Sequence, residues 1–287
     1  MWLVVLVSSA PSPTPNLVPV GVPTTQLGAL GAIYDATAGA GWKYDYKTGA
    51  KWSFASSSET QADPCLSGWV GVRCDSNRTS VIALDVNYMG LSGTLPEKIG
   101  ALTALTYFDA GDNSISGTLP AGLFLLTCLR HFQIDSAQLE GSLPADVGQL
   151  KALTLLYLGS NSLSGSLPVE LFELTALRTL SLFRNKFEGS LSSAVGQLRG
   201  LSVLSLTSNS LSGSLPVALF ELTALLHLSL DSNKFEGTLS PAVGQLKVLN
   251  QLFLSSNSLS GSLPVEEDFR PASFTLIWNM TPGWVIG

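Results

Sequence analysis

Residues 201–213 read L-S-V-L-S-L-T-S-N-S-L-S-G and contain the pattern that decides the fold. The leucines and Asn209 follow the spacing L-x-x-L-x-L-x-x-N-x-L. The closing glycine, Gly213, recurs in steps of 24 residues without slippage. Its equivalents are Gly93, Gly117, Gly141, Gly165, Gly189, Gly237 and Gly261. This constant step predicts eight coils that stack in register.

The spacing is typical of one turn of a leucine-rich repeat. Side chains alternate along a strand, so pairs such as Leu204 and Leu206 are expected to point inward and their neighbours outward. We predict an α/β solenoid, a right-handed leucine-rich-repeat superhelix with a parallel β ladder on its concave face. It has eight 24-residue repeats and an N-terminal cap. Because Pro168 and its equivalents lack an N–H, we expect short turns and a helical half-turn opposite this ladder, without a second long strand.

The 24-residue repeats alternate between two types, so the sequence also has a 48-residue period. Coils continue alternately as N-S-L-S-G-S-L-P-V and as N-K-F-E-G-[ST]-L-S. An array that grew by copying such pairs contains many generic spacer coils, so function is expected where the copies are irregular.

An asparagine recurs at the turn of most coils. A side-chain amide donates and accepts hydrogen bonds at once, which suits backbone groups left open where the chain turns. We therefore predict a structural ladder of Asn113, Asn161, Asn185, Asn209, Asn233 and Asn257. Met89 and Ala137 take this position in two coils, where we expect looser turns.

The composition excludes several classes of protein. The chain has 287 residues, of which 45% are hydrophobic and 13% charged, so it has enough apolar residues for a continuous core. A net charge of −6 disfavours nucleic acid and anionic membranes as partners. No run reaches the roughly 18 apolar residues of a membrane span. Neither a phosphate-binding glycine loop nor kinase motifs occur, and no cofactor or metal is expected.

The chain divides into four segments. Residues 1–23 are a possible signal segment, a short apolar run that no Lys or Arg precedes, followed by a Pro-rich linker. Residues 24–80 form an N-terminal helical and disulfide cap, 81–264 form the repeats, and 265–287 form a degenerate last repeat or C-terminal cap. We expect a secreted or extracellular protein, or a cell-surface one if the chain is a fragment.

The cap contains Trp42, Trp52, Trp69 and the pair Cys65 and Cys74. Large rings cover the open end of the first coil, which a solenoid requires of its terminal unit. The cysteine spacing does not match C-x-x-C and no histidine lies nearby, which favours a structural disulfide over a redox or zinc pair. Cys128 takes a position that alanine fills in other coils, so we expect it to be a packing residue.

Two groups of motifs resemble a known family. In the cap, residues 30–42 read L-G-A-I-Y-D-A-T-A-G-A-G-W, and D-P-C at 63–65 precedes W-V-G-V-R-C at 69–74. In the repeats, L-S-G-x-L-P recurs at 163–168, 211–216 and 259–264. Together they resemble plant-type (LxGxIP-like) extracellular leucine-rich-repeat proteins, among them receptor-kinase ectodomains and polygalacturonase-inhibiting proteins. The resemblance implies recognition of a ligand.

The outward strand positions of the first five coils carry the residue types that form binding hot spots. The candidate ligand-binding residues are Asp85, Tyr107, Asp109, Arg130, His131, Asp135, Tyr157, Phe183 and Arg184. The next two coils offer mostly Ser, Thr and Val. The alternative is that the cluster arose by chance on a tolerant surface.

The predicted function is a secreted, non-enzymatic module that binds a protein, peptide or glycan on its concave face. The alternatives are a truncated ectodomain of a receptor kinase and an inhibitor of a secreted cell-wall hydrolase. Enzymatic activity is not expected, because a carboxylate pair such as Asp85 and Asp109 on an open ladder lacks a cleft. Sequons predict glycosylation at Asn77 and Asn279. The oligomeric state is not predicted.

Overall fold

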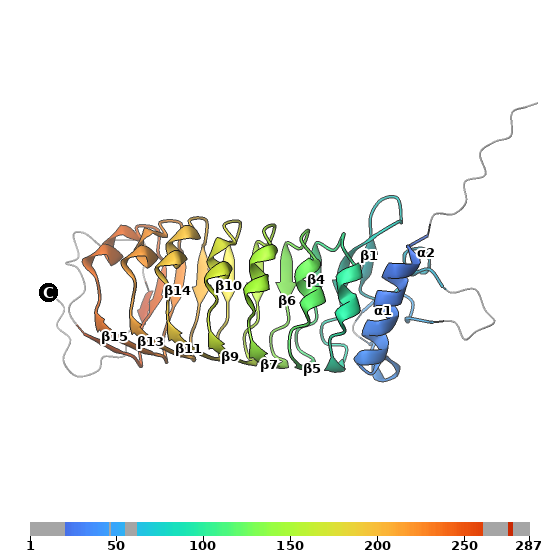
Figure 1. Cartoon of the computed structure of the whole chain (residues 1–287), viewed down its shortest axis with the longest axis horizontal. Coiled ribbons are helices and arrows are strands. Elements are labelled where there is room, and N and C mark those ends of the chain that lie inside the picture. Colours follow the sequence, from blue (N-terminus) through green and yellow to red (C-terminus); the bar gives the residue numbers. More distant parts are fainter. Residues whose placement is uncertain (1–20, 46, 55–61, 261–274, 278–287) are drawn as a thin grey trace, which may run out of the picture.

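The computed structural model describes residues 21–45, 47–54, 62–260 and 275–277. Within these residues the coils stack along the long axis of the molecule, and the helix α1 lies at the N-terminal end (Figure 1). Two sheets run the length of the stack. The predicted solenoid is confirmed.

The first sheet holds the predicted parallel ladder. Its strands pair at equivalent positions of neighbouring coils, for example Leu180 with Leu204. They are β2 (Val81–Asp85), β4 (Tyr107–Asp109), β6 (His131–Gln133), β8 (Leu155–Tyr157), β10 (Thr179–Ser181), β12 (Val203–Ser205), β14 (His227–Ser229), β16 (Gln251–Phe253) and β18 (Thr275–Ile277). We name the solvent-facing side of this sheet the strand face. It corresponds to the concave face of the sequence prediction.

The opposite edge of each coil carries a second parallel sheet, which the sequence prediction missed. Its strands are β3 (Ser92–Thr94), β5 (Ser114–Gly117), β7 (Gln138–Ser142), β9 (Ser162–Ser166), β11 (Lys186–Ser190), β13 (Ser210–Ser214), β15 (Lys234–Thr238) and β17 (Ser258–Ser260). Pro168 does not interrupt this ladder, because it follows the end of β9. The recurring glycine lies within these strands at a positive φ, as at Gly165 with φ 75°. It thus bends a strand and does not end it.

A short 3₁₀ helix follows each of these strands from β3 to β15, in line with the predicted helical half-turn. The helices are η2 (Glu97–Ala101), η3 (Ala121–Leu125), η4 (Ala145–Gln149), η5 (Val169–Glu173), η6 (Ser193–Gln197), η7 (Val217–Glu221) and η8 (Pro241–Gln245). Pro168 and Pro216 precede η5 and η7 as N-cap residues.

The asparagine side chains join neighbouring coils. Asn185 Nδ2 donates to the carbonyl oxygens of Leu158 (2.9 Å) and Leu182 (3.1 Å), and its Oδ1 accepts from the N–H of Leu163 (3.0 Å). The two coils without this asparagine keep the same turn backbone, and looser turns there stay a prediction that hydrogen exchange can test. Tyr88 and Ser136, which precede Met89 and Ala137, keep φ values of 55° and 53°, within the range of the asparagine coils.

The cap closes the N-terminal end with α1 (Thr24–Ala36), η1 (Gly39–Gly41), α2 (Pro64–Ser67) and β1 (Val72–Cys74). Trp42, Trp52 and Trp69 are buried and pack ring against ring, with centroids 4.8 Å apart for the first pair and 5.5 Å for the second. Cys65 and Cys74 form a disulfide. Strand β1 pairs antiparallel with β2, so it occupies the edge that a preceding coil would need.

Cys128 does not have the packing role that we predicted. Its side chain is an exposed free thiol, because the position lies on the loop after η3 and not in the interior. The alanine at the same position is likewise exposed in another coil, at Ala224.

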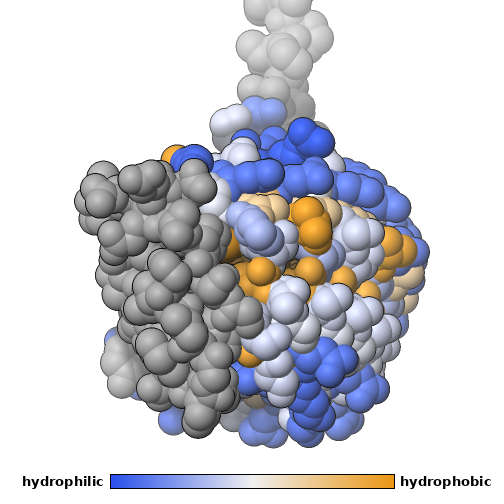
Figure 2. Space-filling model, turned by 90° about the vertical axis from the view of Figure 1, so that its left-hand side faces the viewer, coloured by the Kyte–Doolittle hydropathy of each residue, from blue (hydrophilic) through white to orange (hydrophobic). Residues whose placement is uncertain are grey.

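Hydrophobic residues lie at the surface of the C-terminal end of the stack (Figure 2). Figure 2 looks onto this end, where hydrophobic surface gathers near the centre within a more hydrophilic rim. Strand β18 adds to the first sheet beside β16. The predicted sequon at Asn279 and the segment before residue 21 lie outside the described residues.

Candidate functional site

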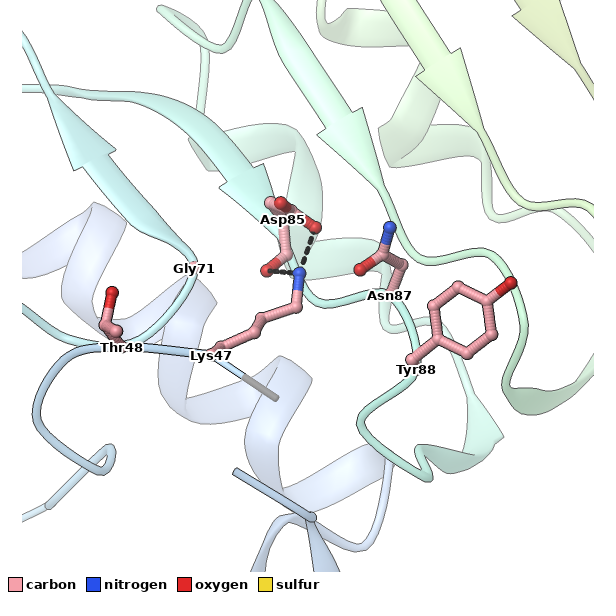
Figure 3. Close-up of a pocket in the computed structure, with 6 residues that line it drawn as sticks. All are labelled: Lys47, Thr48, Gly71, Asp85, Asn87 and Tyr88. Atoms are coloured by element: carbon pink, nitrogen blue, oxygen red, sulfur yellow. Dashed lines mark hydrogen bonds and ion pairs between the residues drawn. The ribbon is translucent and has the colours of Figure 1, made fainter. Parts of the chain in front are cut away.

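The cap folds over the first coil and leaves an open hollow of about 670 Å³ on the strand face (Figure 3). Lys47 and Thr48 line it from the cap, and Asp85, Asn87 and Tyr88 line it from the first coil. Only Asp85 was among the predicted site residues. Tyr88 is 59% exposed although it is a large aromatic residue, which marks this end of the face as unlike the spacer coils.

An ion pair forms the floor of the hollow. Lys47 Nζ contacts Asp85 Oδ1 and also donates to the main-chain carbonyl of Asp85 at 3.1 Å. The lysine side chain is 15% exposed and the aspartate side chain 43% exposed. In Figure 3 the amide oxygen of Asn87 lies on the side of the Lys47 ammonium. The cap therefore supplies the counter-ion of a predicted site residue.

Asp109 is buried, with 3% exposure, so it does not present the exposed carboxylate that we predicted. Its Oδ2 accepts from Asn87 Nδ2 (2.8 Å) and the Tyr107 hydroxyl (3.3 Å), and its Oδ1 accepts from Gly111 N–H (3.0 Å). Burial raises the pKa of the carboxyl, the Gly111 hydrogen bond opposes this, and the Asp85 charge adds to the rise. From its buried position, Asp109 thus holds the side chains of Asn87 and Tyr107 in place.

Asp109→Asn is expected to raise stability at neutral pH. The folded protein binds the Asp109 proton more tightly than the unfolded chain, so this residue favours folding most below the ordinary pKa of 3.8. That contribution is lost as pH rises through the raised value. Melting temperatures of the variant and the parent should therefore differ at pH 7 and converge near pH 3. A variant less stable at pH 7 would mean that the hydrogen bonds to the carboxylate outweigh its burial.

An aromatic row crosses three coils next to this network. The rings of Tyr107 and His131 stack with centroids 4.3 Å apart, and the Tyr157 ring lies 5.8 Å from His131. Burial, followed by the charges of Asp109 and Asp85, raises the pKa of Tyr107 to about 12, so this hydroxyl keeps its proton at physiological pH.

The remaining predicted residues surround this row. Asp135 is half-buried and its Oδ1 accepts from Gln133 Nε2 at 2.7 Å. Phe183 lies over Gly159 of the preceding coil, since a Cβ built on that glycine would meet the ring at 2.2 Å. Arg130 precedes β6 and Arg184 occupies the left-handed turn position with φ 50°, so these exposed residues flank the face on opposite sides.

The described residues bring together no group of three or more potential metal-ligating side chains. Within the same residues, no helix has the length and apolar character needed to cross a membrane.

The comparisons with known proteins agree with this architecture. The Leucine Rich Repeat family matches residues 152–174 and 200–222. A search of curated protein sequences finds no match. Among solved structures, a TDR receptor is 34% identical over 70% of this chain, with a TM-score of 0.65. This chain covers 34% of that receptor.

Two other solved structures cover more of the chain. The ectodomain of the Arabidopsis receptor kinase HAESA, in complex with an N-terminally extended IDA peptide hormone, is 28% identical over 82% of this chain and 43% of that one, with a TM-score of 0.63. A plant ice-binding protein is 26% identical over 89% of this chain and 78% of that one, with a TM-score of 0.72. The chain thus spans less than half of these receptor structures.

Proposed function

The chain is a leucine-rich-repeat protein similar to plant receptor ectodomains, and on this premise we propose that it is a secreted, non-enzymatic module that binds a peptide on its strand face. The observation that carries the proposal is the aromatic row Tyr107–His131–Tyr157 beside the Asp109 network. Aromatic side chains held by hydrogen bonds lose little entropy on binding, which makes them effective anchors.

The difference in side chains between the coils also favours a binding site on the first five coils of the strand face. At the positions of Tyr157 and Phe183, the sixth coil has Ser205 and Thr207. Thr207 donates to Asp231 at 2.7 Å, so its hydroxyl is already used within the protein. A ligand that runs along the coils would thus find its anchors in the first five coils.

Export is part of the proposal. Asn77 is exposed in the turn between β1 and β2, so its side chain is accessible to modification. The neighbouring disulfide also suits an oxidising compartment. Mass spectrometry of the chain secreted from a eukaryotic host should detect a glycan at Asn77, and an unmodified Asn77 would contradict this part.

Tyr157→Ala is expected to weaken peptide binding about ten-fold or more, because it removes a central ring of the row. The matched control is Ser205→Ala, the same strand position two coils away, which should leave affinity unchanged. A displayed library of secreted peptides would first select a ligand, and calorimetry would then compare the variants. Equal affinities for both variants would contradict binding at the aromatic row.

Ice binding is a second candidate, because the match to the ice-binding protein covers more of both chains than the matches to the TDR and HAESA receptors do. The second sheet also carries a column of exposed hydroxyl groups. Its members are Thr94, Thr118, Ser142, Ser166, Ser190, Ser214 and Thr238. Each from Thr94 to Ser214 lies beside the strand glycine of the next coil, which keeps the column uncrowded.

Thermal hysteresis and ice recrystallisation assays test this candidate. Ser190→Tyr would interrupt the column at its centre, whereas Ser205→Tyr alters the strand face and serves as the matched control. Ice binding through the second sheet predicts that only Ser190→Tyr abolishes the activity. A parent protein without activity would eliminate this candidate and leave the peptide proposal untouched.

A further inference from the structure

The hollow in Figure 3 continues into a second one of about 520 Å³. Thr48, Gly71 and Asp85 line both, so the two form one trough between the cap and the first coil. Tyr88 stands at one end and Tyr107 lines the other. We name this feature the cap trough.

The backbone fixes the width of the cap trough. Gly71 has a φ of 73°, and a Cβ at this position would lie 2.0 Å from the main-chain oxygen of Asp85. The N–H of Asp85 donates to the Gly71 carbonyl at 2.7 Å. Cap and coil are therefore hydrogen-bonded to each other in the lining of the trough, which makes it a preformed site.

The Tyr107 ring borders the trough. One face of Tyr107 is covered by His131, whose ring is nearly parallel at 16°. The strand partner on the other side is Ala83, which also lines the trough and is too small to cover a ring. Tyr107 lines the trough and His131 covers one face of its ring, so the rest of the ring is the aromatic wall of the trough.

The floor offers hydrogen-bond donors and acceptors side by side. An ammonium has three N–H donors, and in the described part of the chain Lys47 directs two contacts at Asp85. Asp85 retains a second carboxylate oxygen, and the Asn87 amide oxygen faces the ammonium. A hydroxyl group donates and accepts together, so it matches this alternation better than a group of one kind.

The lining carries one excess positive charge. Lys47 is paired with Asp85, which leaves Arg73 as a single cation, so the trough does not select a strongly charged ligand. Its apolar lining is shallow, because Trp69 is 2% exposed and Ala83 is small. The flat C–H face of a pyranose ring fits the aromatic wall that Tyr107 supplies.

We propose that the cap trough binds a neutral oligosaccharide, with one sugar ring against the Tyr107 ring and its hydroxyl groups on Lys47, Asp85 and Asn87. This site adjoins the peptide site of the proposed function and shares Tyr107 with it, but sugar binding does not depend on peptide binding.

The test titrates the full chain with uncharged cellohexaose, laminarihexaose and chitohexaose, and with anionic hexagalacturonate, by calorimetry and tyrosine fluorescence. We expect one uncharged hexasaccharide to bind and to change the tyrosine signal. Ala83→Leu fills the space beside Tyr107 and should lower its affinity about ten-fold or more. The matched control is Val203→Leu, the same strand position in the sixth coil, which should have no effect.

Lys47→Met provides a second variant, which removes the ammonium and keeps the apolar stem, and should also weaken binding. Melting curves separate loss of affinity from loss of fold. Binding of none of the uncharged sugars, tighter binding of hexagalacturonate than of all of them, or an Ala83→Leu variant that folds and binds normally would each overturn the proposal. Tyr157→Ala should leave sugar affinity unchanged, so the peptide site is judged independently.

Discussion

Replacing Asn185 by alanine is expected to lower the free energy of unfolding by about 3 kcal/mol, because a buried unsatisfied group costs about 1–3 kcal/mol. The substitution leaves the N–H of Leu163 and the carbonyl of Leu158 without the amide that now serves them. Both groups belong to the preceding coil, so the change weakens a junction between coils as well as one turn. Urea denaturation followed by circular dichroism measures the loss.

Two further variants make this result specific. Asn250→Ala removes an exposed asparagine and should change stability by less than about 0.5 kcal/mol. Ala137→Asn introduces the missing amide into a turn whose backbone already has the correct shape and should add about 1 kcal/mol. A loss at Asn185 no larger than that at Asn250 would contradict the structural role of the asparagine ladder.

Trp52→Ala is expected to cost about 3–5 kcal/mol and to unfold the cap before the distant coils. The Trp52 ring packs against Trp42, Trp69 and Phe54, and its Nε1 donates to the Val70 carbonyl at 2.7 Å. Each unit of a solenoid contacts only its neighbours, so the damage should spread from the cap into the first coils.

Hydrogen exchange measures this gradient. Amides of β2 and β4 should lose protection in the variant, while those of β12 and β14 keep it. Leu66→Ala is the matched control, since Leu66 belongs to the cap but is 52% exposed. Uniform loss of protection along the chain would show that the solenoid unfolds as a single unit.

The sequence predicted the parts of the fold that repeat. The 24-residue step places each inward leucine beside its equivalent in the next coil, as Leu180 beside Leu204. The structure of one coil therefore predicts that of the next. The sequence does not predict the second sheet, because Pro168 lacks a donor and the repeat does not show that this proline lies beyond the end of the strand. Exposure of Cys128 was missed for a related reason, since alanine fills both interior and surface positions.

The candidate site was harder to predict because it joins segments that share no period. Lys47 and Asp85 are 38 residues apart in the sequence, and no pattern in the cap predicts their contact. Asp109 looked like its column neighbour Asp85, yet the side chains of Tyr107 and Asn87 bury it. One signal was available: Tyr88 is a large aromatic residue at a turn position that holds serine in most of the other coils.

Strand β1 determines at which end the stack of coils can be lengthened. It lies antiparallel on β2, and a disulfide holds it there, so no parallel strand can join at that edge. Duplication can lengthen the molecule only on the far side of the first coil. A change in the number of coils therefore leaves the junction between the cap and the first coil unchanged. A surface feature at this junction keeps the same neighbouring residues when later coils are duplicated.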